Sequence, residues 1–121
     1  MSVFSKVLIT VICCFSLTCN AMTLKQYLDA QKSSSDSMKR IVSDTYLNGA
    51  SQAYIVANEE AKTTGGKYIF CPPRNLSFGH QELKSVIDSW IKANPSAEKK
   101  LTDYPIEIVA MDGLKYIYPC N

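Results

Sequence analysis

The sequence predicts an all-α domain, a small helical bundle of about four helices stapled by one disulfide. Three observations favour this fold class. Apolar residues recur at spacings of three and four after Thr23, Ser37, Ser77 and Asp103, which is the pattern of helices with one buried face. Only the short segment 67–71 has the composition of a strand, and a lone strand has no partner for a sheet. Two cysteines remain once the N-terminal segment is set aside.

Residues 1–21 have the features of a secretory signal peptide. Lys6 is the positive start, residues 7–17 are an apolar run, and small residues precede a cleavage point after Ala21. An uncleaved membrane anchor is the first alternative, but the run is shorter than the roughly 20 apolar residues of a spanning helix. A lipoprotein acylated at Cys19 is the second, but Leu17 and Thr18 are large for that motif. We therefore expect an exported domain of residues 22–121 with no stable membrane insertion.

Removal of the signal segment leaves two cysteines, Cys71 and Cys120, of the five in the full chain. An even number of cysteines in an exported chain predicts one disulfide between them. A metal site or a reactive thiol is the alternative, but the chain has a single His and no CxxC spacing. We expect no metal and no cofactor.

The first half of the domain is expected to hold two helices. A short amphipathic stretch begins at Thr23 and includes Leu28, and the serine-rich segment 33–36 breaks it and offers N-cap residues. A long helix is predicted from Ser37 to about Lys62, ended by the glycines at 65 and 66. Close packing against another helix of the chain would explain Gly49 in its middle. The apolar positions of this helix are Met38, Ile41, Val42, Leu47, Ala50, Ala53, Tyr54 and Ala57.

The second half is expected to hold two more helices. Segment 67–71 is an extended connection, and the prolines at 72 and 73 keep the next helix from starting early. Ser77 is the expected N-cap of a helix over 78–94, and residues 96–101 are expected to form a single turn. Asp103 is the expected N-cap of a last helix over 104–117, which has Pro105 in its first turn. The predicted core-facing residues are Leu83, Val86, Ile87, Trp90 and Ile91 in the first of these helices and Ile106, Val109, Ala110, Leu114 and Ile117 in the second.

Composition and motifs exclude several classes of function. A formal net charge of +2 is too small to indicate a nucleic-acid partner. The sequence contains no GxSxG, HExxH or P-loop motif. Cys71 and His80 are the one pair that resembles a nucleophile with its base, and the predicted disulfide takes Cys71 out of that role. We therefore predict no catalytic residues and no enzyme, but a binding or inhibitory module.

An ordered set of short motifs indicates a more specific kind of binding protein. Phe70-Cys71-Pro72-Pro73 is followed by Leu76-Ser77 and Gln81, then by a helix with Trp90-Ile91 that stops at Asn94-Pro95, and the chain closes on Tyr118-Pro119-Cys120. With the signal segment, this set resembles the Rap/Tai family of type VI secretion immunity proteins. The resemblance covers roughly residues 24–120. The stretch Ala53-Tyr54-Ile55 departs from the Gly-Tyr-Ile that is commoner in the family, and the helices before Cys71 lack the cysteine that some members carry there.

The resemblance implies a periplasmic all-α protein, often a homodimer, that binds a cognate peptidoglycan-cleaving amidase and blocks its active site. Cys71 and Cys120 match the family's cysteines. The motif marks no contact residues, so we choose them from loops that the disulfide and prolines stiffen, because aromatic and Arg residues dominate such interfaces. The predicted partner-binding residues are Tyr68, Arg74 and Asn75 in one loop, and Lys99, Lys100 and Tyr104 in the other.

Two other kinds of protein fit the same features. One is a different exported binding module, such as a lysozyme inhibitor or an acid-stress periplasmic chaperone, since a single disulfide and helical content suit both. The other is a small hydrolase that uses Cys71, which requires that thiol to be free.

Overall fold

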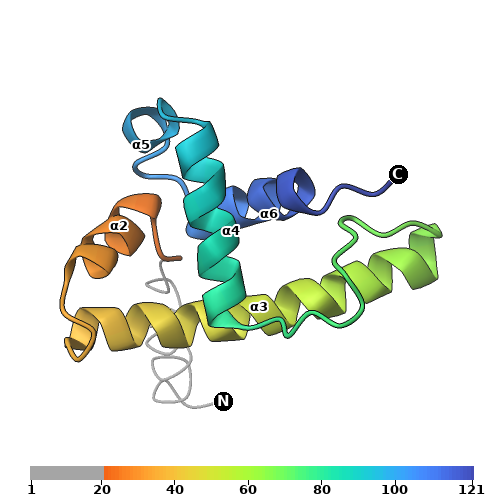
Figure 1. Cartoon of the computed structure of the whole chain (residues 1–121), viewed down its shortest axis with the longest axis horizontal. Coiled ribbons are helices and arrows are strands. Elements are labelled where there is room, and N and C mark those ends of the chain that lie inside the picture. Colours follow the sequence, from red (N-terminus) through yellow and green to blue (C-terminus); the bar gives the residue numbers. More distant parts are fainter. Residues whose placement is uncertain (1–20) are drawn as a thin grey trace, which may run out of the picture.

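The computed structural model describes residues 21–121, which form five helices and no strand (Figure 1). In chain order the helices are α2 (Leu24–Lys32), α3 (Met38–Gly65), α4 (His80–Ala93), α5 (Ala97–Lys100) and α6 (Ile106–Ile117). The all-α fold class and the Cys71–Cys120 disulfide are therefore confirmed. The predicted signal segment, apart from Ala21, lies outside the described residues. Within residues 21–121, no helix is both long enough and apolar enough to cross a membrane.

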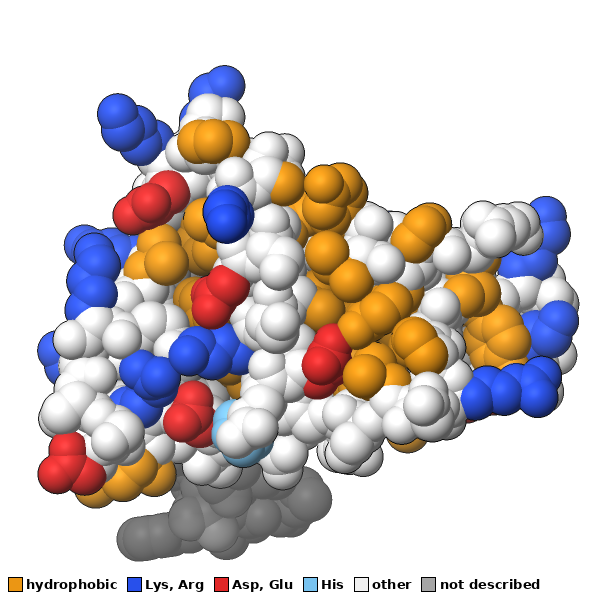
Figure 2. Space-filling view, in the orientation of Figure 1, with side chains coloured by type: hydrophobic (Ala, Val, Ile, Leu, Met, Phe, Trp, Pro, Cys, Tyr) orange, Lys and Arg blue, Asp and Glu red, His pale blue; other side chains and the backbone are white. Residues whose placement is uncertain are grey.

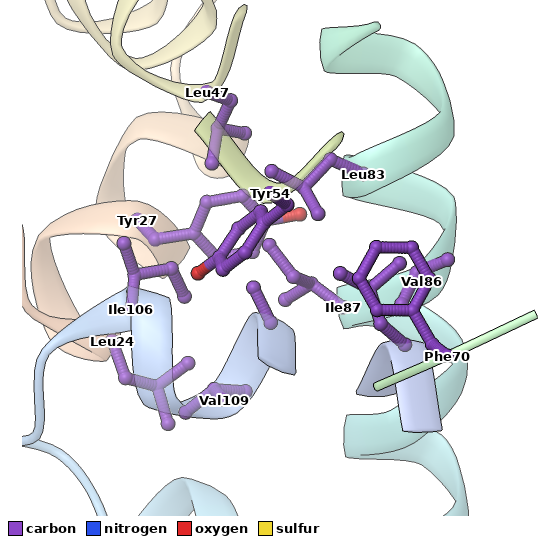
Figure 3. Close-up of a cluster of buried hydrophobic side chains, with 12 residues drawn as sticks. Leu24, Tyr27, Leu47, Tyr54, Phe70, Leu83, Val86, Ile87, Ile106 and Val109 are labelled. Atoms are coloured by element: carbon purple, nitrogen blue, oxygen red, sulfur yellow. The ribbon is translucent and has the colours of Figure 1, made fainter. Parts of the chain in front are cut away.

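The long helix α3 forms the base of the molecule, and α4 stands across it (Figure 1). α4 packs against both α3 and α6, while α2 contacts α3 and α6. The core lies where these four helices meet, and residues from all four point into it (Figure 3). Its buried side chains are those of Leu24, Tyr27, Leu47, Tyr54, Phe70, Leu83, Val86, Ile87, Ile106, Val109, Ala110 and Leu114.

The apolar stripes predicted for α4 and α6 face the core as expected, with one exception. Trp90 and Ile91 are partly buried and pack against the core, whereas the prediction for Ile117 was wrong, because its side chain is 36% exposed. α6 ends at Ile117, and the next residue turns back toward α4. The two helices approach closely at Gly113, where an added Cβ would lie 2.8 Å from Cγ1 of Val86. A glycine is therefore what allows this crossing.

The start of α2 is joined to the start of α6 by backbone hydrogen bonds. The Leu24 N–H donates to the carbonyl of Tyr104 (2.9 Å), and the Ile106 N–H donates to the carbonyl of Met22 (2.8 Å). Thr23 caps α2 through a reciprocal pair of bonds with Gln26, which is a capping box. The prediction that Asp103 caps the last helix was wrong: Pro105 occupies that position, because the chain before α6 is held in pairing with the N-terminal segment.

Capping residues in the local sequence explain where α3 begins and ends, but the hydrophobic pattern does not predict which face of the helix is buried. Ser37 accepts the N–H of Arg40 as N-cap, in place of the serines predicted upstream, and Gly66 ends the helix with φ 75°, a conformation that glycine adopts without strain. The core-facing residues share a helical spacing of three and four; they are Ser43, Leu47, Ser51, Tyr54 and Asn58.

The apolar stripe predicted for the start of α3 was wrong. Met38 is 73% exposed, and Ile41 and Val42 are about half exposed. Met38 precedes Leu47 by nine residues, which places it roughly 180° around the helix from the core. Ala53 and Ala57 are also exposed. The buried face of α3 is therefore built mainly of small and polar side chains.

The predicted packing role of Gly49 was also wrong, because a Cβ at this position would meet no atom within 4 Å. We expect Gly49→Ala to raise the free energy of unfolding by up to about 1 kcal/mol, since alanine costs less backbone entropy in a helix. Urea denaturation of dilute protein measures this change. A lower free energy for the variant would contradict the prediction and would place a neighbour against this face.

α4 begins later than predicted. Gly79 is its N-cap and makes no side-chain capping bond, so Ser77 does not cap the helix. Residues 76–78 stay outside the helix, because Phe78 stacks on the buried Phe70 ring at a centroid distance of 6.3 Å. Residues 97–100 form the predicted single turn, α5.

Candidate functional site

The connection between α3 and α4, residues 66–79, carries the candidate site, and a single α3 side chain organises it. Asn58 is 5% exposed. Its Oδ1 accepts the N–H groups of Ile69 (2.8 Å) and Phe70 (3.1 Å), and its Nδ2 donates to the Phe70 carbonyl (2.9 Å). One amide thus satisfies three backbone groups that have no strand partner. The extended connection predicted from the sequence is held in place by this side chain.

The C-terminal tail gives the connection a second attachment. The disulfide joins Cys71 to Cys120, and the Cys71 N–H donates to the carbonyl of Tyr118 at 2.8 Å. The Tyr118 hydroxyl donates to the Glu82 carboxylate on α4. Burial, together with this bond to a carboxylate, raises the pKa of Tyr118 to about 12, so the hydroxyl remains a donor at neutral pH. The connection, the tail and α4 form one linked unit.

A hollow of about 430 Å³ lies between the C-terminal half of α3 and this connection. Figure 2 shows hydrophobic side chains gathered over this part of the molecule, with Lys and Arg side chains along its outer edge. We call the hollow the connection groove. It is lined by Ile55, Asn58, Glu59, Tyr68, Phe70, Cys71, Pro72, Pro73, Arg74, Leu76 and Phe78.

The first predicted partner-binding loop lies at this groove. Tyr68 and Arg74 line it, and Asn75 follows Arg74 in the same turn, exposed to solvent. The Tyr68 side chain is 40% exposed, and Nζ of Lys62 lies 5.6 Å from the centre of its ring. This distance is within the range of a cation–π contact. Aromatic and cationic groups therefore meet at the exposed edge of the groove.

The second predicted loop lies elsewhere. Lys99 and Lys100 are exposed on α5, and Tyr104 is exposed just before α6. In Figure 1, α5 stands at the far end of α4 from α3, well separated from the connection. The structure therefore does not bring the two predicted sets together into one surface.

The sequence offers one candidate nucleophile, Cys71, and the structure places it in the disulfide. Cys71 is bonded to Cys120, so it offers no thiol to His80. Within residues 21–121, no three His, Cys, Asp or Glu side chains come together as metal ligands would. Burial raises the pKa of Tyr27 and of Tyr54. Both hydroxyls donate structural bonds, the first to Asp88 (2.6 Å) and the second to the Glu107 carbonyl (2.7 Å).

Sequence reasoning missed the part of the groove that α3 supplies. Ile55, Asn58 and Glu59 line it from that helix. One signal in the sequence points to Asn58, because it continues the spacing of Leu47 and Tyr54 and a buried polar side chain needs hydrogen-bond partners. The exposed Ile55 and Glu59 carry no comparable signal.

Comparison with known proteins yields no match: no protein family, no curated protein and no solved structure is similar to this chain.

Proposed function

We propose that this protein is a periplasmic immunity protein that binds a cognate peptidoglycan amidase delivered by type VI secretion and occludes its active site. The producing cell and its sister cells would thereby be protected. The proposal rests on the ordered motifs that resemble the Rap/Tai family. A disulfide suits an oxidising compartment such as the periplasm.

The observation that carries the proposal is the joining of the motif's two ends. Phe70-Cys71-Pro72-Pro73 and Tyr118-Pro119-Cys120 are far apart in the sequence, yet a disulfide and a backbone hydrogen bond tie them together beside the connection groove. The residues that carry the resemblance at the two ends of the set therefore lie beside one surface, which supports a binding role for it. Occlusion needs a rigid surface and no reacting group, which fits the contents of this site.

The proposal includes a homodimer. The outer face of α3 exposes Met38, Val42 and Gly49, and an exposed apolar face on one helix is suited to contact with a second copy. Sedimentation at micromolar concentration measures this association. A monomer at all concentrations would remove this part of the proposal and leave the inhibitor role in place.

We expect a gene beside this one to encode an amidase, and we expect the full chain to protect cells that export that amidase. Induction of the exported amidase alone should cause lysis, and co-expression of this chain should prevent it. The matched control is the same chain without residues 1–21, which keeps the inhibitor in the cytoplasm and should give no protection. The proposal fails if the full chain protects against no amidase of its locus.

The exposed apolar residues at the start of α3 favour one other candidate, an acid-stress chaperone. Light scattering of a denatured client at low pH separates the two functions. Suppressed aggregation without binding to any amidase would favour the chaperone.

A further inference from the structure

We propose that the connection groove receives an exposed segment of the partner enzyme that carries an apolar or aromatic side chain beside a carboxylate. This inference rests on the proposed function and goes beyond it, because it selects one of the two predicted loops and states the chemistry that the loop recognises.

The walls of the groove suit an apolar side chain. Ile55 and Tyr68 present partly exposed apolar surface from two sides, and Leu76 and Phe78 are half-buried between them. A hollow of about 430 Å³ has room for a large side chain and part of its backbone.

The charges around the groove favour an acidic neighbour for that side chain. Arg74 lines the groove, and Lys62 holds its ammonium group over Tyr68 while donating to the Gly66 carbonyl. Within residues 21–121 the structure forms one ion pair, between Arg40 and Asp44, so no carboxylate of the described residues forms an ion pair with Arg74. An exposed guanidinium without a partner is a ready bidentate donor for a carboxylate.

One carboxylate of the chain lines the groove, and it does not balance these cations. Glu59 lies on α3 across from the connection. The next acidic residue, Glu60, is one position further and points about 100° away around the helix. Lys67 adds another exposed cation next to Tyr68. The connection side of the groove is therefore positive, and an incoming acidic segment complements it there.

The groove is held rigid before any partner arrives. Asn58, the disulfide and two adjacent prolines fix the backbone that leads into Arg74, which lowers the entropy lost on binding. Lys99 and Lys100 project from α5, a helix of four residues, and do not line this groove. These residues provide a control surface of similar charge.

The test is calorimetric binding of the purified mature protein to the amidase that we expect the neighbouring gene to encode. We expect Arg74→Glu to raise Kd by about tenfold or more, since it replaces a charge-assisted contact with repulsion. The matched control Lys99→Glu makes the same change of charge on α5 and should change Kd by less than about threefold. Both sites are exposed, so circular dichroism should show both variants folded.

A photo-crosslinking residue at position 68, compared with one at position 104, tests the chemistry of the occupant. Position 68 should crosslink to an amidase segment that contains Asp or Glu beside an apolar residue, and position 104 should not crosslink. Equal Kd values for the two charge variants, or a crosslinked segment without an acidic residue, would overturn the groove assignment while leaving the inhibitor role intact. No binding by the unaltered protein would overturn both.

Discussion

Replacing both Cys71 and Cys120 with serine should lower the free energy of unfolding by roughly 4 kcal/mol. The bridge closes a loop with a sequence separation of 49, and in the chain-entropy model a longer closed loop restricts the unfolded chain more strongly. A typical domain has about 5–15 kcal/mol in total, so this loss is large. Urea unfolding of the double variant, set against the oxidised protein, measures it.

Reduction provides the matched control for the double serine variant. The unaltered protein in a strong reductant should lose a similar free energy, because both treatments open the same bridge. An unchanged melting temperature under reductant, with reduced cysteines verified by thiol titration, would contradict the prediction. Reduction should also weaken the protection of the Cys71 N–H from hydrogen exchange, because this group donates to the Tyr118 carbonyl beside the bridge.

Replacing Asn58 with alanine should lower the free energy of unfolding by about 3 kcal/mol. The substitution removes three hydrogen bonds at once and leaves the N–H of Phe70, a 1% exposed residue, without a partner. Denaturation measures the loss, and hydrogen exchange should show faster opening at Ile69 and Phe70 before the core helices open.

Ser51→Ala is the matched control for this change. Ser51 is buried on the same face of α3, but its hydroxyl donates to the Asn48 carbonyl within its own helix. Removal of this hydroxyl should lower the free energy of unfolding by well under half as much as Asn58→Ala, since no distant backbone group loses a partner. Equal losses for the two variants would show that Asn58 acts only by filling space.

The sequence predicts those helices whose buried face is purely apolar. In α4 and α6 the residues that recur at helical spacing are the residues that pack, so Leu83, Ile87 and Leu114 were placed correctly. In α3 the rule fails, because Ser43 and Ser51 are buried while Met38 faces solvent. Small side chains let neighbouring helices approach closely, and a hydrophobic pattern does not record that preference.

Contacts between residues far apart in the sequence determine where the helices begin and how the candidate site is built, so the sequence alone predicts these features poorly. Ser77 and Asp103 have good capping side chains, yet the stacking of Phe78 on Phe70 and the pairing beside Pro105 set where α4 and α6 begin. Parity of the cysteines was enough to predict the disulfide, and with it the attachment of the tail. The α3 wall of the groove depends on Asn58, whose partners lie in another segment.

The backbone bonds between the start of α2 and the segment before α6 make the two ends of the domain depend on each other. Two N–H groups in the first turn of α2, those of Leu24 and Lys25, donate to carbonyls of residues 104 and 102, near the opposite end of the chain. The first turn of α2 therefore depends on a segment that lies about 80 residues later in the sequence. A chain that stops short of residue 102 lacks the carbonyl groups that accept both of these N–H groups.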